Sequence, residues 1–389
     1  QIMEDLKKEA KSRGLWNLFH PHPEWGPGLT NLEYAPLAEI MGRSHIASEA
    51  CNCAAPDTGN MEVFTLFGTD EHKEKYLKPL LDGTIRSAFA MTEPGVASSD
   101  ATNVEMSMVR DGDDYVLNGR KWWSTGVGHP DCKVAIFMGL TDPDAHKHRR
   151  HSMVLVPLDT PGVKIERMLP VFGAYDEPYG HGVVSFDNVR LPAFNLVGGE
   201  NNGWQGASTH LEIEHGLLRS AVRSDEMLGR VLDYARETTR GGRPLTEDLD
   251  VQDALVEFYI QSQVTRLLHF RNFAYRAQGR QLTYEGPQAY LHQKRSALVK
   301  AKAILEVMGP RAQVSDPEWA VADGHVEVHQ RASIVEQHPG GTAEIQRVIM
   351  GHDHHRAAGG DLADLGLGQG GKQRVQPRRR LGQFLGAGI

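Results

Sequence analysis

The spacing of apolar residues changes twice along the chain, and this double change constrains the fold more than any other feature. From residue 1 to about 85 apolar residues recur at helical spacing, whereas from about 102 to 197 they form the short runs typical of strands. Helical spacing returns at Leu211 and continues to about Met350. We therefore expect an α+β fold, with an N-terminal helical domain at 1–88, a middle β domain at 89–200 and a C-terminal helical bundle at 201–350.

Turn-forming residues subdivide these regions further. Asn118-Gly119 lies between two strand-like runs and predicts a hairpin turn. Within the bundle, Arg240–Pro244 and Met308–Pro310 predict breaks between helices. The segment 351–389 is rich in Gly, Arg and Gln and poor in periodic apolar residues, so we expect a disordered tail there.

Composition excludes several classes of protein. The net charge of −8 argues against a nucleic-acid binder, and no apolar run approaches the roughly 18 residues of a membrane span. The three cysteines, Cys51, Cys53 and Cys132, form neither a disulfide framework nor a zinc set, which favours a reducing compartment. The chain begins at Gln1 inside a helical pattern, so its N-terminus looks truncated, and both cytoplasm and mitochondrial matrix fit.

Two polar and aromatic segments indicate a cofactor site. Phe89–Gly95 carries a threonine and backbone donors, and Lys121–Thr125 combines adjacent indoles with two hydroxyl groups. A flat redox-active heterocycle needs apolar walls and a few fixed donors at its edge. The alternatives are that Trp122 and Trp123 form a core-and-edge pair on a hairpin, and that Ser98–Asp100 is a turn or N-cap cluster. No Gly-x-Gly-x-x-Gly follows a strand, so a Rossmann site is not supported.

These segments resemble the flavin-binding segments of the acyl-CoA dehydrogenase family, and the resemblance extends over about residues 1–350. It implies a middle β-barrel domain, a C-terminal four-helix bundle and bound FAD. It places Thr92 at the edge of the flavin ring, and Ser98 near both the flavin and the acyl-CoA. The FAD contacts implied in the β domain are Phe89, Met91, Thr92, Ser98, Trp123, Ser124 and Thr125.

The C-terminal bundle adds further implied contacts. Gly340–Arg347 is similar to the closing Gly-Thr signature of the family, which makes Thr342 and Gln346 FAD contacts. Thr342 could instead serve only as a helix N-cap, and both roles are compatible. The family's pyrophosphate-binding arginine, which reaches a partner subunit, is replaced here by Thr238 at its usual spacing. Arg240 could substitute for it, with Arg236 as the alternative, and each could equally be a solvated surface arginine.

The catalytic base is less clear from the sequence. Much of the family carries a carboxylate immediately before the closing Gly-Thr, but this chain has Gly340 there, which cannot act as a base. Other branches place the base on the first long bundle helix, which selects Glu214, with Glu212 as the alternative. Because residues two apart point about 200° apart on a helix, only one of them can face the flavin. His215 stands where an arginine is usual, as a substrate contact, and both acids could instead be exposed.

The resemblance implies an FAD-dependent acyl-CoA dehydrogenase that forms a trans-2-enoyl-CoA and passes electrons to electron-transferring flavoprotein. It also implies a homodimer or homotetramer. The strings Asn60–Val63 and Ser99–Asn103 look nearest to the branch with long-chain and kinase-fused mammalian members, whereas the bundle looks more bacterial. The alternatives are a catalytically silent FAD-binding subunit of a hetero-oligomer and an acyl-CoA oxidase-like flavoenzyme.

Two groups of histidines invite a metal interpretation. They are His146, His148 and His151, and His352, His354 and His355. The first group lies in a basic loop with Lys147, Arg149 and Arg150, and the second sits at the tail boundary without cysteines or a clear set of carboxylates. We therefore expect surface or loop histidines and no metal site.

Overall fold

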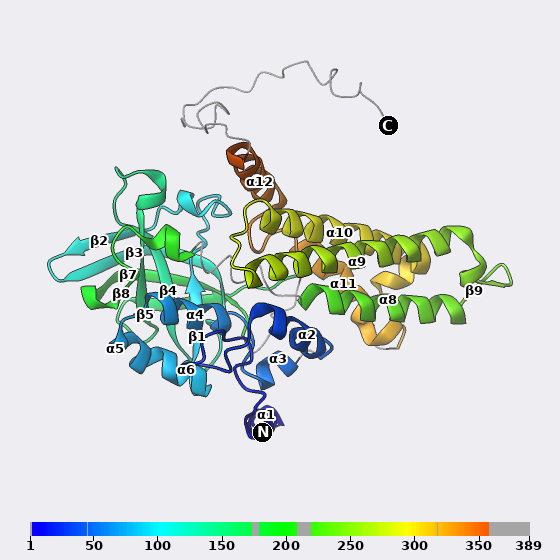
Figure 1. Cartoon of the computed structure of the whole chain (residues 1–389), viewed down its shortest axis with the longest axis horizontal. Coiled ribbons are helices and arrows are strands. Elements are labelled where there is room, and N and C mark those ends of the chain that lie inside the picture. Colours follow the sequence, from blue (N-terminus) through cyan, green and yellow to red (C-terminus); the bar gives the residue numbers. More distant parts are fainter. Residues whose placement is uncertain (1, 45, 173–178, 208–218, 317, 358–389) are drawn as a thin grey trace, which may run out of the picture.

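The computed structural model describes residues 2–44, 46–172, 179–207, 219–316 and 318–357, without side chains at 219–225 and 352–357. Figure 1 shows the sheet and the long C-terminal helices side by side, with the N-terminal helices against both. Helices come first, strands next and helices last. The predicted α+β fold, with its three regions in this order, is confirmed. Within the described residues, no helix has both the length and the apolar character needed to cross a membrane.

The N-terminal region is a set of short helices. Their bounds are α1 (Ile2–Ser12), α2 (Asn31–Met41), α3 (Ala47–Ala50), α4 (Asp57–Phe67), α5 (Asp70–His72), the π-turn η1 (Lys73–Leu77) and α6 (Lys78–Asp82). Helix α2 begins with a capping box in which Thr30 and Glu33 satisfy each other's backbone N–H groups. Helix α4 is buried along most of its length and carries Met61 and Phe64 into the core shared with the sheet.

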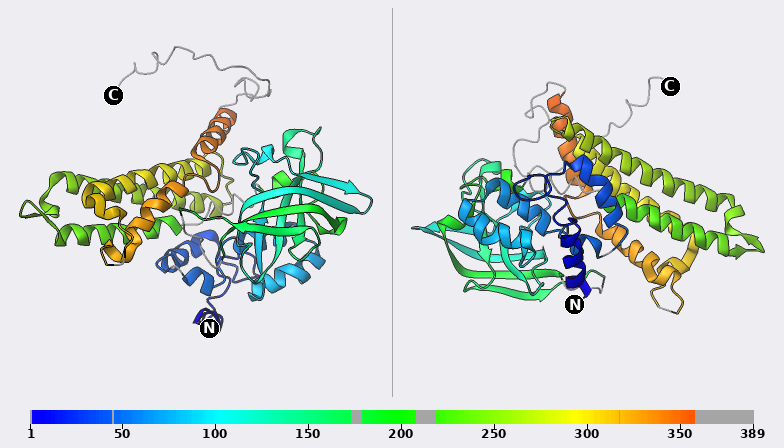
Figure 2. Two further views of the ribbon diagram at one scale, coloured as in Figure 1. Left: turned by 180° about the vertical axis from the view of Figure 1, so that it is seen from behind. Right: turned by 60° about the horizontal axis from the view of Figure 1, so that its bottom comes forward.

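The middle region forms one sheet of eight strands. They are β1 (Arg86–Ala90), β2 (Ser107–Asp111), β3 (Asp114–Thr125), β4 (Cys132–Leu140), β5 (His151–Pro157), β6 (Val163–Met168), β7 (His181–Pro192) and β8 (Leu196–Val197). Their order is β6-β7-β3-β2-β4-β5-β8, and β1 pairs with β4 in parallel. Strands β4 and β5 are apolar on both faces because the sheet separates two cores. The N-terminal helices cover one of these faces, as the rear view in Figure 2 also shows.

A buried ionic cluster joins the N-terminal helices to the sheet. Arg86 begins β1, and its guanidinium lies 2.7 Å from the Asp57 carboxylate and 2.8 Å from the Glu49 carboxylate. Asp57 also accepts hydrogen bonds from the backbone N–H and the hydroxyl of Ser87. These contacts fix the start of the strand that leads into the first cofactor segment.

The hairpin turn predicted at Asn118-Gly119 is wrong. Strand β3 runs through both residues, and the turn that joins it to β2 lies at Gly112-Asp113, between the paired residues Asp111 and Asp114. Gly119 has φ +138°, and a Cβ there would lie 2.7 Å from Cγ of Met106. Glycine is therefore required by a close approach inside the strand rather than by a turn.

The C-terminal region is built from helices. They are α8 (Arg219–Glu237), α9 (Leu249–Ala277), α10 (Glu285–Met308), α11 (His325–Val335) and α12 (Ala343–Ala357). Of these, α8, α9 and α10 run alongside one another (Figure 1). The predicted breaks are confirmed, since β9 (Thr239–Arg240) and β10 (Arg243–Pro244) form a small hairpin and α10 ends at Met308. Helix α12 continues past residue 350, so the backbone at 351–357 is helical and the tail predicted from 351 is wrong there. Residues 358–389 lie outside the described part of the chain.

Candidate functional site

A β-bulge presents Trp123 at the surface of the middle domain. The register between β3 and β7 shifts between Lys121 and Ser124, so two residues of β3 stand opposite one of β7. Trp123 has φ +53°, in the left-handed region, and its side chain is 40% exposed. Bulges re-aim side chains and often mark functional sites, and a left-handed tryptophan carries strain that the surrounding structure must maintain.

The structure brings the two cofactor segments together. The backbone N–H of Trp122 donates to the carbonyl of Thr92 at 3.0 Å, so the bulge and the Met91-Thr92 segment, which precedes the turn at Pro94-Gly95, are neighbours. Thr92 is half-buried, while Phe89 and Met91 pack against the core shared with the N-terminal helices. The alternative that the tryptophans are a core-and-edge pair stays a prediction: Trp122 is half-buried, Trp123 is exposed, and their ring centroids lie 6.1 Å apart.

A buried ion pair stabilises the junction, by which we mean the contact between the Thr92 segment and the Trp123 bulge. Lys121 Nζ lies 2.7 Å from the Glu93 carboxylate and donates to the carbonyls of Met91 and Met138 at 2.9 and 2.7 Å. Glu93 also accepts from the backbone N–H groups of residues 105 and 106. Burial lowers the pKa of Lys121 to about 8, and the Glu93 carboxylate opposes this shift. Sequence analysis missed this pair, although both residues belong to the segments that it selected.

The serine loop, Ser98–Asp100, connects the β domain to the turn that precedes α12. Ser98 is buried, and its hydroxyl oxygen accepts from the backbone N–H of Glu93 at 2.9 Å. The hydroxyl oxygen of Ser99 accepts from the backbone N–H of Thr342 at 2.9 Å. Ser98 is therefore part of the structure that shapes the first cofactor segment, and the closing Gly-Thr signature lies beside that same loop.

The closing signature forms a tight turn before α12. Gln346 is buried, and its Nε2 donates to the carbonyl of Gly340 at 2.7 Å. Thr342 accepts from the N–H of Ile345 at 3.4 Å, as an N-cap would. Lys294 on α10 donates to the carbonyls of Glu336 and Pro339, just before the signature. Burial lowers the pKa of Lys294 to about 8.

One residue at the bulge has no counterpart in the sequence analysis. His181 begins β7 and pairs with Thr125, and its Nδ1 lies 3.0 Å from the Thr125 hydroxyl oxygen. Its ring centroid lies 5.9 Å from that of Trp123. Register prediction between β3 and the following strand could have found it, but the bulge changes that register by one residue.

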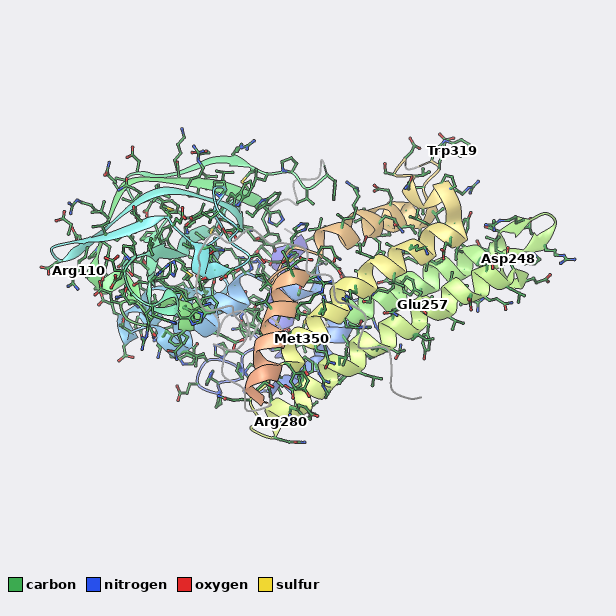
Figure 3. All side chains as sticks on the ribbon, turned by 90° about the horizontal axis from the view of Figure 1, so that it is seen from above. Arg110, Asp248, Glu257, Arg280, Trp319 and Met350 are labelled. Carbon is green, nitrogen blue, oxygen red and sulfur yellow. The ribbon has the colours of Figure 1, made fainter. Side chains whose placement is uncertain are left out.

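Several predicted site residues do not lie at this junction. Arg240 is in the hairpin at the far end of the bundle, beside Asp248, which Figure 3 shows at the end remote from the sheet. Arg236 pairs with Asp233 near the same end. Glu212, Glu214 and His215 lie outside the described residues, so their positions stay predictions.

The acids beside the signature do not provide an obvious base. Glu344 is exposed and lies 3.1 Å from Arg347. Gly340 stands at the position that carries a carboxylate in much of the family, as the sequence analysis noted. Glu93 is buried but occupied by Lys121 and two backbone donors, which leaves it unsuited to removing a proton.

The histidine prediction needs one correction. His151 is not a loop or surface residue: it begins β5, is fully buried and lies 2.8 Å from the carbonyl of Val104. The imidazole of His148 stacks on Trp204 with ring centroids 4.9 Å apart. Within the described residues, no group of three or more His, Cys, Asp and Glu side chains could hold a metal ion.

The junction has the features that a flavin needs. Trp122 Nε1, Ser124 Oγ and Gln346 Oε1 are buried without a hydrogen-bond partner in the described part of the chain. Trp122 and Ser124 flank the exposed Trp123 in the chain, while Gln346 lies at the start of α12. Buried polar groups are normally satisfied, so unsatisfied ones beside an exposed indole fit a ligand with a polar edge and a flat apolar face. The residues present therefore fit FAD.

Comparison with known proteins identifies the family. Residues 1–84, 88–189 and 201–353 match the N-terminal, middle and C-terminal domains of acyl-CoA dehydrogenases. A Mycobacterium abscessus structure described as an acyl-CoA dehydrogenase shares 42% identity and a TM-score of 0.83, covering 92% of this chain and 87% of that one. The chain belongs to the acyl-CoA dehydrogenase family. The family's members bind FAD, in keeping with the junction described above.

Curated acyl-CoA dehydrogenases are similar over part of their length. "Probable acyl-CoA dehydrogenase FadE2" of Mycobacterium tuberculosis is 52% identical over 69% of this chain and 65% of its own length. Acyl-CoA dehydrogenase family member 11 of mouse is 39% identical over 87% of this chain and 41% of its own length. The chain thus spans less than two thirds of either relative. The PigA structure with FAD and proline, at 23% identity and a TM-score of 0.77, shows the fold alone.

Proposed function

We propose that this chain is an FAD-dependent acyl-CoA dehydrogenase that converts an acyl-CoA thioester to the trans-2-enoyl-CoA. The observation that carries the proposal is the hydrogen bond between Trp122 N–H and the Thr92 carbonyl, which joins the two cofactor segments beside the exposed Trp123 ring. Family membership supports the same chemistry.

The residues at the junction would hold FAD from several sides. Trp123 would cover one face of the flavin, Thr92 would meet its edge, and the Thr125 hydroxyl would lie near N5. Thr342 and Gln346 would contact the rest of the cofactor from the start of α12. When bound, FAD supplies the two-electron acceptor for hydride from the substrate β-carbon.

The chain must also provide a base for the α-proton. We assign this role to Glu214, with Glu212 as the alternative, because the other acids near the junction are exposed or already paired. A carboxylate buried beside an acyl chain would have a raised pKa, which suits proton removal from a thioester α-carbon. His215 and Ser98 would contact the thioester substrate.

Anaerobic mixing with acyl-CoAs of graded chain length tests the proposal. We expect the 450-nm absorbance of the protein-bound flavin to bleach, with a preferred chain length. A flavin-loaded protein that no acyl-CoA bleaches would favour the catalytically silent subunit, which Gly340 motivates. Rapid peroxide formation in air would favour the oxidase-like alternative.

The assignment of the base has its own test. Glu214→Gln should slow substrate-dependent bleaching by about 10²- to 10⁴-fold, the usual range for a general base, while FAD content stays unchanged. Glu212→Gln is the matched control, two positions away in the sequence, and should retain wild-type bleaching. The reverse result would transfer the role to Glu212.

The proposal includes partners. Arg240 lies at the end of the bundle remote from the Thr92 junction, so a role in FAD binding requires a second copy of the chain. We therefore propose a homodimer or homotetramer, with electron-transferring flavoprotein as the electron acceptor. Analytical ultracentrifugation of the FAD-loaded protein should show an oligomer, and Arg240→Gln should weaken FAD binding; a monomer that binds FAD normally would contradict this.

A further inference from the structure

The His181 imidazole is fixed next to the hydroxyl group that we place near the flavin. His181 and Thr125 are paired across β7 and β3, so their side chains lie on the same face of the sheet. The backbone N–H of Leu169 donates to the His181 carbonyl at 2.7 Å, and Trp123 lies against the imidazole. The 3.0 Å contact between His181 Nδ1 and Thr125 Oγ1 is therefore built into the fold.

This contact decides what the Thr125 hydroxyl can offer to a third group. A hydroxyl has one proton and two lone pairs, while Nδ1 of a neutral imidazole either accepts or donates, depending on the tautomer. When Nδ1 accepts a hydrogen bond from the Thr125 hydroxyl, only the oxygen lone pairs remain for another partner. When Nδ1 carries the proton and donates, the Thr125 O–H is free to donate elsewhere.

The requirement at flavin N5 changes in the same way during the reaction. In the proposed dehydrogenation, hydride leaves the substrate β-carbon for N5, and the α-proton goes to the carboxylate base, so two electrons and two hydrogens leave the substrate. Oxidised N5 is a hydrogen-bond acceptor, but after hydride transfer it bears an N–H and becomes a donor. A hydroxyl beside N5 must then present its oxygen, and its own proton needs another acceptor.

We infer that His181 is a positioning residue that favours the reduced flavin by accepting, at Nδ1, the hydrogen bond that the Thr125 hydroxyl donates. The inference rests on the proposed function, because it requires FAD at the Thr125 end of β3. His181 touches neither the substrate nor the reacting atoms in this account. It acts through Thr125, whose oxygen it leaves free to accept from N5–H.

Three substitutions separate this role from simple packing. His181→Phe retains a ring against Trp123 but has no Nδ1, whereas His181→Asn places an amide, which can accept or donate, where Nδ1 stood. Ser185→Ala is the matched control, since Ser185 lies on the same strand and its hydroxyl bonds only the carbonyl of Lys164 among the contacts described.

The measurement is the midpoint potential of bound FAD, determined by anaerobic reduction with a reference dye, together with the affinity for oxidised FAD. In His181→Phe the ratio of affinities for reduced and oxidised FAD should fall about tenfold, which is about 30 mV toward negative potential for a two-electron couple. His181→Asn should restore the ratio to within about twofold, as expected for one replaced hydrogen bond. Ser185→Ala should match the wild type.

A wild-type potential in His181→Phe would overturn the inference, and so would a lowered potential in His181→Asn equal to that of His181→Phe. If the His181→Phe protein does not retain FAD, His181→Gln takes its place in the test. The glutamine amide lies one bond farther from the backbone than Nδ1 did and therefore misses Thr125. An unchanged midpoint potential in His181→Gln would also overturn the inference. Failure of the wild-type protein to bind FAD would instead refute the proposed function.

Discussion

Two turns carry the cofactor motifs. One is the β-domain turn within Met91–Gly95 and the other is the C-terminal turn before α12, and each is stabilised by a buried lysine. In the β domain, Lys121 pairs with the Glu93 carboxylate at 2.7 Å. In the bundle, Lys294 donates to the carbonyls of Glu336 and Pro339 at 2.9 and 2.7 Å, and the Glu336 and Glu344 carboxylates oppose the lowering of its pKa by burial. The first turn is held by charge, the second mainly by backbone hydrogen bonds.

This difference indicates how each turn is organised. Lys121 and Glu93 connect four chain segments, namely β3, β4, the Met91–Glu93 turn and residues 105–106. The turn before α12 has fewer ties, to α10 through Lys294 and to the serine loop through Thr342. We therefore expect the β-domain turn to be set before the cofactor binds and the C-terminal turn to gain more order from binding.

Removal of Lys121 should have the largest effect. Lys121→Met leaves the Glu93 carboxylate buried without its partner, which costs about 3–5 kcal/mol of unfolding free energy. Urea unfolding of the deflavinated protein would measure this loss. The matched control is Lys302→Met, because Lys302 forms an exposed pair with Glu306 at 3.3 Å; its effect should stay within about 0.5 kcal/mol. Equal effects would contradict the account.

Removal of Lys294 should cost less. Lys294→Met leaves two carbonyls without a donor but strands no directly paired carboxylate, so we expect a loss of about 1–3 kcal/mol. FAD affinity should fall as well, because the turn that presents Thr342 loses its support. Urea unfolding and FAD titration would measure the two effects. A loss larger than that of Lys121→Met would break the comparison.

Stability should depend on pH through the same lysine. The pKa of Lys294 is about 8 in the folded chain against an ordinary value of 10.5, so between these values the unfolded chain binds more protons. The penalty for burying the ammonium group is therefore complete below pH 8 and is relieved toward pH 10.5. The stability gap between wild type and Lys294→Met should widen by about 1 kcal/mol between pH 7.5 and 9.5. Urea unfolding at both pH values tests this, and a constant gap would contradict it.

The contact between the two turns should give the smallest effect. Ser99→Ala removes the acceptor for the Thr342 N–H, which is exposed enough for water to replace it, so stability should change by about 0.5 kcal/mol or less. FAD affinity should fall by about two- to fivefold, as expected when one hydrogen bond no longer orders the turn. Isothermal titration with FAD would measure the change. An affinity loss beyond about tenfold would mean that the C-terminal turn is as rigidly held as the β-domain turn.

The sequence predicted the parts of the site that depend on contiguous residues. The switch from helical to strand spacing gives the three regions, and the Thr92 and Trp123 segments are each short motifs of consecutive residues. The turn prediction at Asn118-Gly119 was wrong because an Asn-Gly pair is typical of turns, whereas Gly119 is required here by its close approach to Met106 within a strand.

Features that depend on pairing between distant segments could not be predicted in this way. The Lys121–Glu93 pair and the Thr125–His181 contact join residues 28 and 56 positions apart, and the second depends on a one-residue bulge. Glu214 and Glu212 lie outside the described part of the chain. On the helix that the sequence predicts there, the choice between them depends on the rotation of the helix, and a two-residue change of register reverses the answer.

The central claim is that the bulge at Trp123 forms a wall of a flavin site, and titration of the deflavinated protein with FAD tests it most directly. The wild-type chain should bind one FAD per chain with quenching of tryptophan fluorescence, because the flavin would cover the exposed Trp123 ring. Trp123→Leu should lose part of that quenching and weaken binding by about tenfold or more, the usual value of one lost stacking contact. Unchanged affinity and quenching in Trp123→Leu would contradict the claim.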